Sequence, residues 1–96
     1  MVTRSDFDSI MQVRNSFCIS GREALSGEEI GFIRDTLELE SRNDIELENI
    51  KTLVTLVYSV LEDNASDLEN ASCFRDTSSV IRGVIDWEIA RRHFAW

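Results

Sequence analysis

The segment from about residue 44 to residue 63 constrains the fold more than any other part of the sequence. Its apolar residues recur three or four positions apart: Ile50, Leu53, Val54, Val57, Val60 and Leu61. Its polar residues keep the same interval independently: Glu48, Lys51, Thr52, Thr55, Ser59, Glu62 and Asp63. An α-helix places such residues on one face, whereas a strand would scatter the polar set over both faces. The pattern therefore predicts a long amphipathic helix, although valine alone favours strands.

The residues that break regular structure are too scarce for a small β-domain. The chain of 96 residues contains no proline and only four glycines. An all-β sandwich or barrel needs a turn about every 8–12 residues, and these residues usually supply it. Apolar residues make up 43% of the chain, enough for a packed core. We expect an all-α fold: one domain over residues 1–96, an antiparallel bundle of four to five helices.

Four short motifs have the form of a helix-capping box, in which a side-chain oxygen accepts from the N–H three residues on and a glutamate reaches back. They are Ser20 with Glu23, Ser26 with Glu29, Asn43 with Glu46, and Ser66 with Glu69. Together with the apolar spacing they predict helices over about residues 4–18, 27–42, 44–63 and 78–94. A further turn or two is expected within 67–74.

The expected inward faces of the other helices follow the same spacing. The residues are Phe7, Ile10, Met11, Phe17 and Cys18 in the first helix, Ile30, Ile33 and Leu37 in the second, and Val80, Ile81, Val84, Ile85, Ile89 and Phe94 in the last. Two ion pairs are expected in the favourable i,i+4 order, Glu38 with Arg42 and Glu88 with Arg92.

Two features leave alternatives open. Segments 67–74 and 78–94 can be two helices or one continuous helix. In addition, apolar residues alternate with glutamate in Leu37–Glu40 and in Ile45–Glu48, which is also how a minor β-hairpin over 37–48 would read. Glutamate is poor in strands and the flanking patterns are helical, so the helical interpretation is favoured.

The negative charge is concentrated in the middle of the chain. Ten Lys and Arg stand against 18 Asp and Glu, a net charge of −8. Residues 23–69 hold 13 acids and three bases, a net of −10, and each flank is +1. The acids gather near the two expected helix joins: Glu38, Glu40, Asp44, Glu46, Glu48, Glu62, Asp63, Asp67 and Glu69. Such a surface attracts a basic partner and repels phosphate, so we expect these residues to bind protein and not nucleic acid directly.

The sequence contains no recognisable set of catalytic or metal-binding residues. Cys18, Cys73 and His93 are too few for a structural zinc site, which needs four ligands. Residues 63–74 suggest a calcium loop, but Ala65, Leu68 and Phe74 occupy positions that need an oxygen ligand or glycine. No glycine-rich phosphate loop is present. We therefore expect no enzyme activity, no cofactor and no metal.

Two cysteines are also too few for the disulfide framework of a small secreted scaffold. The N-terminal residues lack the apolar stretch of a signal peptide, and the most apolar run, 53–61, is far shorter than the roughly 20 residues of a membrane span. We expect a cytoplasmic protein with reduced thiols and no contact with membranes.

The function hypothesis that agrees best with size and charge is a stoichiometric inhibitor. An immunity or antitoxin-type protein would use the acidic middle to cover the positive cleft of a basic partner such as a nuclease toxin. The alternative is a regulatory adaptor or helical dimerisation module, which makes a homo-oligomer possible. In it Trp87, Phe94 and Trp96 would form the interface beside Arg91 and Arg92, unless these aromatics complete the core. A weaker alternative is a phage-encoded nucleic-acid mimic that acts on a host factor.

Overall fold

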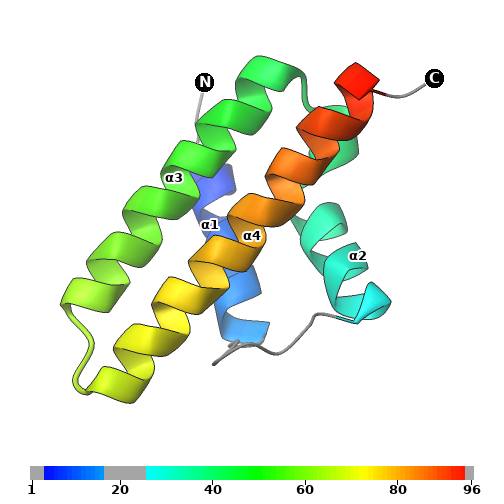
Figure 1. Cartoon of the computed structure of the whole chain (residues 1–96). Helices are drawn as coiled ribbons and strands as arrows, with labels where there is room; N and C mark the ends of the chain where they lie inside the picture. The colour runs from blue at the N-terminus through cyan, green and yellow to red at the C-terminus, as the bar shows by residue number, and fades with distance from the viewer. Residues whose placement is uncertain (1–3, 17–25, 95–96) are drawn as a thin grey trace.

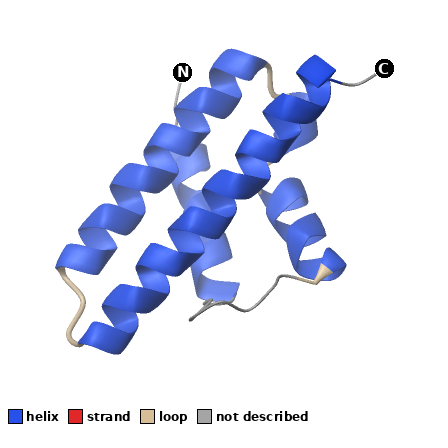
Figure 2. Ribbon diagram, in the orientation of Figure 1, coloured by secondary structure: helices blue, strands red, loops and turns tan. Residues whose placement is uncertain are grey.

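The computed structural model describes residues 4–16 and 26–94, which form an all-α bundle (Figure 1). Its elements are α1 (Arg4–Ser16), α2 (Gly27–Thr36), the short 3-10 helix η1 (Leu39–Ser41), α3 (Asp44–Asp63) and α4 (Leu68–Phe94). No strand occurs in these two ranges (Figure 2). The predicted fold class is confirmed.

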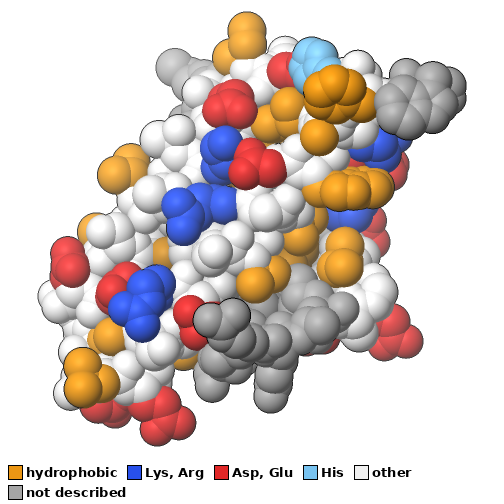
Figure 3. Space-filling model, viewed as in Figure 1, with side chains coloured by type: hydrophobic (Ala, Val, Ile, Leu, Met, Phe, Trp, Pro, Cys, Tyr) orange, Lys and Arg blue, Asp and Glu red, His pale blue; other side chains and the backbone are white. Residues whose placement is uncertain are grey.

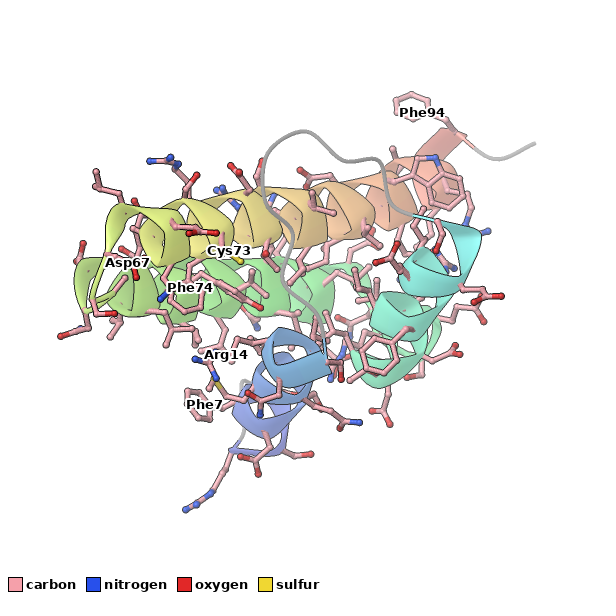
Figure 4. The ribbon with its side chains drawn as sticks, turned by 90° about the horizontal axis from the view of Figure 1, so that it is seen from below. Phe7, Arg14, Asp67, Cys73, Phe74 and Phe94 are labelled. Atoms are coloured by element: carbon pink, nitrogen blue, oxygen red, sulfur yellow. The ribbon has the colours of Figure 1, made fainter. Side chains whose placement is uncertain are left out.

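The long helices α3 and α4 run antiparallel and form one layer, joined by residues 64–67. The shorter helices α1 and α2 pack on one side of this pair, behind it in Figure 1. In the view from below they again lie on a single side of α3 and α4 (Figure 4). The opposite side of the α3–α4 pair is therefore not covered by another described helix.

All the described helices contribute to one core. The fully buried apolar side chains are Ile10 and Val13 of α1, Ile33 of α2, Leu37 and Leu39 of the α2–α3 join, Leu47, Ile50, Val54 and Tyr58 of α3, and Ile81 and Ile85 of α4. Val57 is buried, and Leu53 and Leu61 are half-buried against this core. The predicted α3 stripe is thus confirmed except for Val60, which is 59% exposed, while Tyr58 was missed.

The join between α2 and α3 differs from the prediction. Helix α2 ends at Thr36, and Glu38 adopts a left-handed conformation with a φ of 55°. This turn lets Leu37 and Leu39 both point inward while Glu38 and Glu40 face solvent. The alternation that imitated a strand therefore arises from a tight turn and a 3-10 helix, and the hairpin over 37–48 does not form.

The predicted pair of Glu38 with Arg42 is wrong for the same reason. Arg42 lies beyond the helix, where its Nε donates to the Leu37 carbonyl at 2.7 Å and its Nη2 pairs with Asp6 Oδ1 at 2.7 Å. Asp6 is 6% exposed, so this ion pair is buried and fixes α1 against the join.

Two of the predicted capping boxes are confirmed with both of their hydrogen bonds, Ser26 with Glu29 at the start of α2 and Asn43 with Glu46 at the start of α3. The box predicted at Ser66 is wrong. Asp67, one residue later, accepts the Asn70 N–H at 2.8 Å. Segments 67–74 and 78–94 belong to one helix, α4. The box at Ser20 lies outside the described residues.

Three residues expected to face inward are instead exposed: Phe7 at 42%, Ile30 at 36% and Phe94 at 66%. Met11, Val80, Val84 and Ile89 are half-buried, and Phe17 and Cys18 lie outside the described residues. A small bundle has too few helices to cover the whole of each apolar face, which explains why residues at the edges of the stripes reach solvent.

Cys73 is buried and disulfide-bonded. The expectation of a reduced thiol at this position is therefore wrong. Among the described helices, none has both the length and the continuous apolar character required to cross a membrane.

The contrast between Ile50 and Leu56 tests the orientation of α3. Ile50 is 1% exposed and Leu56 is 59% exposed on the same helix. Ile50→Ala should lower the free energy of unfolding by about 2–5 kcal/mol because it leaves a cavity, whereas Leu56→Ala should change it by less than about 0.5 kcal/mol. Chemical denaturation followed by circular dichroism measures both, and equal losses would contradict this orientation.

Tyr58 gives a second test, because its hydroxyl is buried and has no hydrogen-bond partner among the described residues. Burial raises the pKa of this phenol to about 12, although the nearby Arg14 charge opposes the shift. Tyr58→Phe removes only the unsatisfied hydroxyl and should raise the free energy of unfolding by about 1 kcal/mol. Tyr58→Leu also removes the edge-on ring contact with Phe74 and should lower it. A loss of stability in Tyr58→Phe would show that the hydroxyl is satisfied in solution.

Candidate functional site

The nine acidic residues predicted to bind a partner form two groups at opposite ends of α3. We call Glu38, Glu40, Asp44, Glu46 and Glu48 the join acids, and Glu62, Asp63, Asp67 and Glu69 the acidic turn. Helix α3 has 20 residues and therefore separates the two groups by about 30 Å. This is several times the distance of about 8 Å over which salt screens exposed charges under physiological conditions, so the two groups act as separate surfaces.

Most of the join acids have contacts within the protein. Glu40 pairs with Arg34 at 3.1 Å, and Asp44 contacts Arg92 at 3.4 Å and His93 at 2.7 Å. Glu46 caps α3 and Glu48 lies 3.7 Å from Lys51. Of the five carboxylates, only that of Glu38 has no partner in the described part of the chain. Bases within the fold therefore neutralise part of the negative charge at this end.

Behind the join acids lies a buried carboxylate, Glu88 of α4, which is 0% exposed. Its oxygens are 2.8 Å from Arg34 Nη2, 2.7 Å from Arg91 Nη2 and 2.9 Å from Arg92 Nε. Burial by itself raises the pKa of Glu88, but the hydrogen bonds from these arginines prevail and hold it at about 2. We call this group the Glu88 cluster.

Arg92 also connects the Glu88 cluster to the backbone of the join. Its guanidinium donates to the carbonyls of Leu39 at 2.8 Å and Glu40 at 3.3 Å, and to that of Arg42. These carbonyls lie in η1 and in the turn before α3, where backbone hydrogen bonds are few and that of Leu39 accepts only a long one from the Arg42 N–H, at 3.4 Å. The cluster therefore fastens the C-terminal end of α4 to α2, η1 and the start of α3.

The predicted pair of Glu88 with Arg92 is confirmed, but the burial of Glu88 and the roles of Arg34 and Arg91 were missed. A signal was present in the sequence, because Glu88 continues the inward spacing set by Ile81 and Ile85. A carboxylate at a core position requires charged partners. The spacing could not reveal that Arg34, from another helix, is one of them.

The acidic turn is neutralised much less than the join acids. Glu62 lies 3.7 Å from Arg75, a long contact with a guanidinium that is 62% exposed. Asp67 caps α4, while Asp63 and Glu69 are exposed and form no ion pair within the described ranges. Leu68, 88% exposed, lies among them. Figure 3 shows acidic side chains beside an apolar one at the lower end of the molecule, where this turn lies in Figure 1.

A different surface is formed by aromatic side chains near the end of α4. Trp87 is 59% exposed and Phe94 66% exposed, and Arg91 lies between them in the sequence with 44% of its side chain exposed. The Arg34 guanidinium lies 5.6 Å from the centre of the Trp87 ring. The expectation that Trp87 completes the core is therefore wrong, and Trp96 lies outside the described residues. We call Trp87, Arg91 and Phe94 the aromatic patch; Figure 4 labels Phe94 at the far end of α4.

The carboxylates of the acidic turn can attract cationic groups over a distance. Within residues 4–16 and 26–94, no three His, Cys, Asp or Glu side chains are grouped in a way that could hold a metal ion. The two strongly shifted pKa values belong to Glu88 and Tyr58, both of which are enclosed by the core.

Comparison of the chain with models of protein families, with curated proteins and with solved structures finds no match. Interpretation of function therefore depends on the surfaces described above.

The Glu88 cluster predicts a particular pH dependence of stability. A carboxylate whose pKa falls on folding from about 4.5 to about 2 stabilises the protein above its unfolded pKa, and this stabilisation disappears as the pH falls towards 2. Glu88→Gln should therefore lower the free energy of unfolding by about 3–5 kcal/mol at pH 7. The difference in the free energy of unfolding between Glu88→Gln and the parent protein should shrink between about pH 4.5 and pH 2.

Thermal unfolding at a series of pH values measures this difference. Glu69→Gln is the matched control, because Glu69 is exposed; it should follow the parent protein throughout. A Glu88→Gln deficit that stays constant down to pH 2 would show that the ionised carboxylate is not the stabilising species.

Proposed function

We propose that this protein is a non-enzymatic inhibitor of the immunity or antitoxin type, and that it binds a basic protein partner through the acidic turn. The observation that carries the proposal is the exposure of Asp63 and Glu69 without internal ion pairs, next to Asp67 and the weakly paired Glu62. Carboxylates that are not neutralised within the fold leave their charge available to an approaching cationic surface.

Of the nine residues predicted to bind a partner, only those at the acidic-turn end of the molecule are proposed to form the contact. The join acids support the Glu88 cluster, cap α3 or pair with neighbouring bases, so using them in an interface would cost contacts that hold the fold. In the acidic turn, the cap that Asp67 provides is the main contact that stabilises the fold. We therefore assign the contact with the partner to the acidic turn.

A nuclease domain is the class of partner that agrees best with this surface. The cleft of a nuclease must be positive to hold phosphate, and closely spaced carboxylates can occupy the same positions as phosphates. Leu68 among the acids supplies an apolar side chain for the centre of such a contact, where charge alone gives speed but limited affinity. A phage-encoded mimic of nucleic acid would use the same surface and is the weaker alternative.

An adaptor or a helical dimerisation module is the second candidate, and the exposure of Trp87 and Phe94 favours it. Aromatic residues and arginine are enriched at the centres of protein interfaces, and the aromatic patch combines both. In that case the acids only keep the protein dissolved, and a second copy of the chain or a regulatory protein would cover the aromatic patch.

A cytoplasmic location remains part of the proposal, since an inhibitor of this class acts on a partner made in the same cell. The disulfide at Cys73 weighs against it, because disulfides persist mainly in oxidising compartments.

A pair of charge-reversed variants tests the acidic turn. Asp63→Lys with Glu69→Lys changes the net charge from −8 to −4, and so does the control Asp8→Lys with Asp35→Lys, which alters exposed acids on α1 and α2. With a partner isolated by affinity capture at low salt, association measured by surface plasmon resonance should be at least about tenfold slower for the first pair. The difference should decrease as salt rises, because exposed charges are then screened.

Equal slowing by the two pairs would mean that only net charge matters and would reject the acidic turn as the binding surface. The adaptor hypothesis gives the opposite pattern: Trp87→Ala with Phe94→Ser would abolish binding or self-association, and the charge reversals would have almost no effect. Val60→Ser, at an exposed apolar position outside the aromatic patch, controls for a general loss of surface hydrophobicity.

A further inference from the structure

A small cleft lies between α3 and α4 and contains a different kind of chemistry from the acidic turn. Its volume is about 120 Å³, and polar side chains from both helices line it. They are Thr55, Tyr58, Ser59 and Glu62 of α3 and Arg75, Ser78 and Arg82 of α4. Figure 3 shows Lys and Arg side chains along the α3–α4 pair on the face turned away from α1 and α2.

The sequence spacing explains how these residues meet. Thr55, Ser59 and Glu62 are separated by four and three positions, so they occupy one face of α3. Residues 75, 78 and 82 are separated by three and four positions on α4. They are the polar faces of two helices whose apolar faces form the core, and the antiparallel packing of α3 and α4 places them against each other.

Arg82 is the most informative residue of the cleft. It is half-buried, and its Nε donates to the Ser78 carbonyl at 3.3 Å. It forms no ion pair with any carboxylate of the described residues. In a chain with a net charge of −8, acids to pair with an arginine are plentiful, so an arginine recessed in a cleft without one retains donors for a ligand.

Besides the buried Tyr58 hydroxyl described above, Ser78 and Arg75 of the cleft also have donors that are not fully used. Ser78 is 6% exposed, and its hydroxyl has no hydrogen-bond partner among the residues that the structure describes. A serine within a helix often bonds the carbonyl four residues earlier, as Thr55 does with Lys51 at 3.0 Å, but Ser78 does not. Arg75 makes only long contacts, 3.7 Å to Glu62 and 3.4 Å to Ser72 Oγ.

We propose that this cleft binds a small tetrahedral oxyanion, such as a phosphate dianion or the phosphate group of a small monoester. Arg82 supplies the principal charged donors, Arg75 the second guanidinium, and Ser78 a hydroxyl from the floor of the cleft. Guanidinium groups form strong charge-assisted hydrogen bonds with phosphate oxygens. This site does not rest on the acidic turn being a binding surface.

The size of the cleft limits the ligand. Pockets for drug-sized molecules usually measure about 300–1,000 Å³, and a cleft of 120 Å³ corresponds to the volume of about four water molecules. It has room for one phosphate group, and the rest of a phosphate monoester would lie outside the cleft.

Glu62 makes the proposal sharply testable, because it is the one acid that lines the cleft. Its carboxylate repels an oxyanion and competes for Arg75. Removing its charge should therefore strengthen binding, an effect opposite to that expected of a residue that merely holds the cleft together.

The experiment is a titration of the whole chain with inorganic phosphate at constant ionic strength and pH 7.5, followed by amide chemical shifts in NMR. Saturable shifts should be confined to the cleft, including Thr55, Ser78 and Arg82. Arg82→Gln should weaken binding at least about tenfold and Glu62→Gln should tighten it, while Arg4→Gln, at an exposed arginine of α1, should leave it unchanged. Circular dichroism verifies that each variant is folded.

A parallel titration with glycerol phosphate distinguishes the two sources of the oxyanion, since tighter binding than that of inorganic phosphate assigns the site to a monoester. Shifts spread over the surface without saturation would overturn the proposal. So would equal affinity of the parent protein and a folded Arg82→Gln variant.

Discussion

The arrangement of this bundle depends most on the ion pairs that the buried, ionised carboxylate of Glu88 forms with arginines. A carboxylate removed from water is costly unless positive charge and hydrogen bonds replace the lost hydration. Here Arg34, Arg91 and Arg92 supply both. These arginines come from α2 and α4, and Arg92 also contacts the backbone of the join. The contacts of one buried charge therefore set the positions of α2, η1, the start of α3 and the end of α4. The second buried pair, Asp6 with Arg42, fixes the position of α1 against the same join.

Much of the fold could be predicted from local patterns, since a helix reveals its inward face through spacing and its start through a cap. The stripe of α3 and the caps at Ser26 and Asn43 are features of this kind. The α2–α3 join could not be predicted in the same way. A strand and a tight left-handed turn both alternate inward and outward side chains over a few residues. Only the requirement to bury Leu37 and Leu39 against other helices distinguishes them.

For the candidate surfaces, too, the sequence shows which residues are charged but not which distant residues they contact. Charge counting along the sequence identified both acidic groups, but it could not separate acids that are neutralised by distant residues from acids that are not. Asp44 contacts Arg92 and His93 from the other end of the chain, whereas Asp63 is exposed and forms no ion pair among the described residues. The cleft that contains Arg82 was likewise invisible, although its α3 residues belong to the polar set that first indicated the helix.

The way in which Arg92 holds the join has a consequence for how this protein can change its sequence. The guanidinium contacts backbone oxygens of residues 39, 40 and 42, and every amino acid offers the same oxygen at a given backbone position. Side chains at positions 40 and 41 can therefore be exchanged while the anchoring of α4 is kept, provided that the backbone path is retained. The join is thus a natural place for sequence drift between relatives by substitution, whereas an insertion between positions 39 and 42 would displace the oxygens that Arg92 contacts.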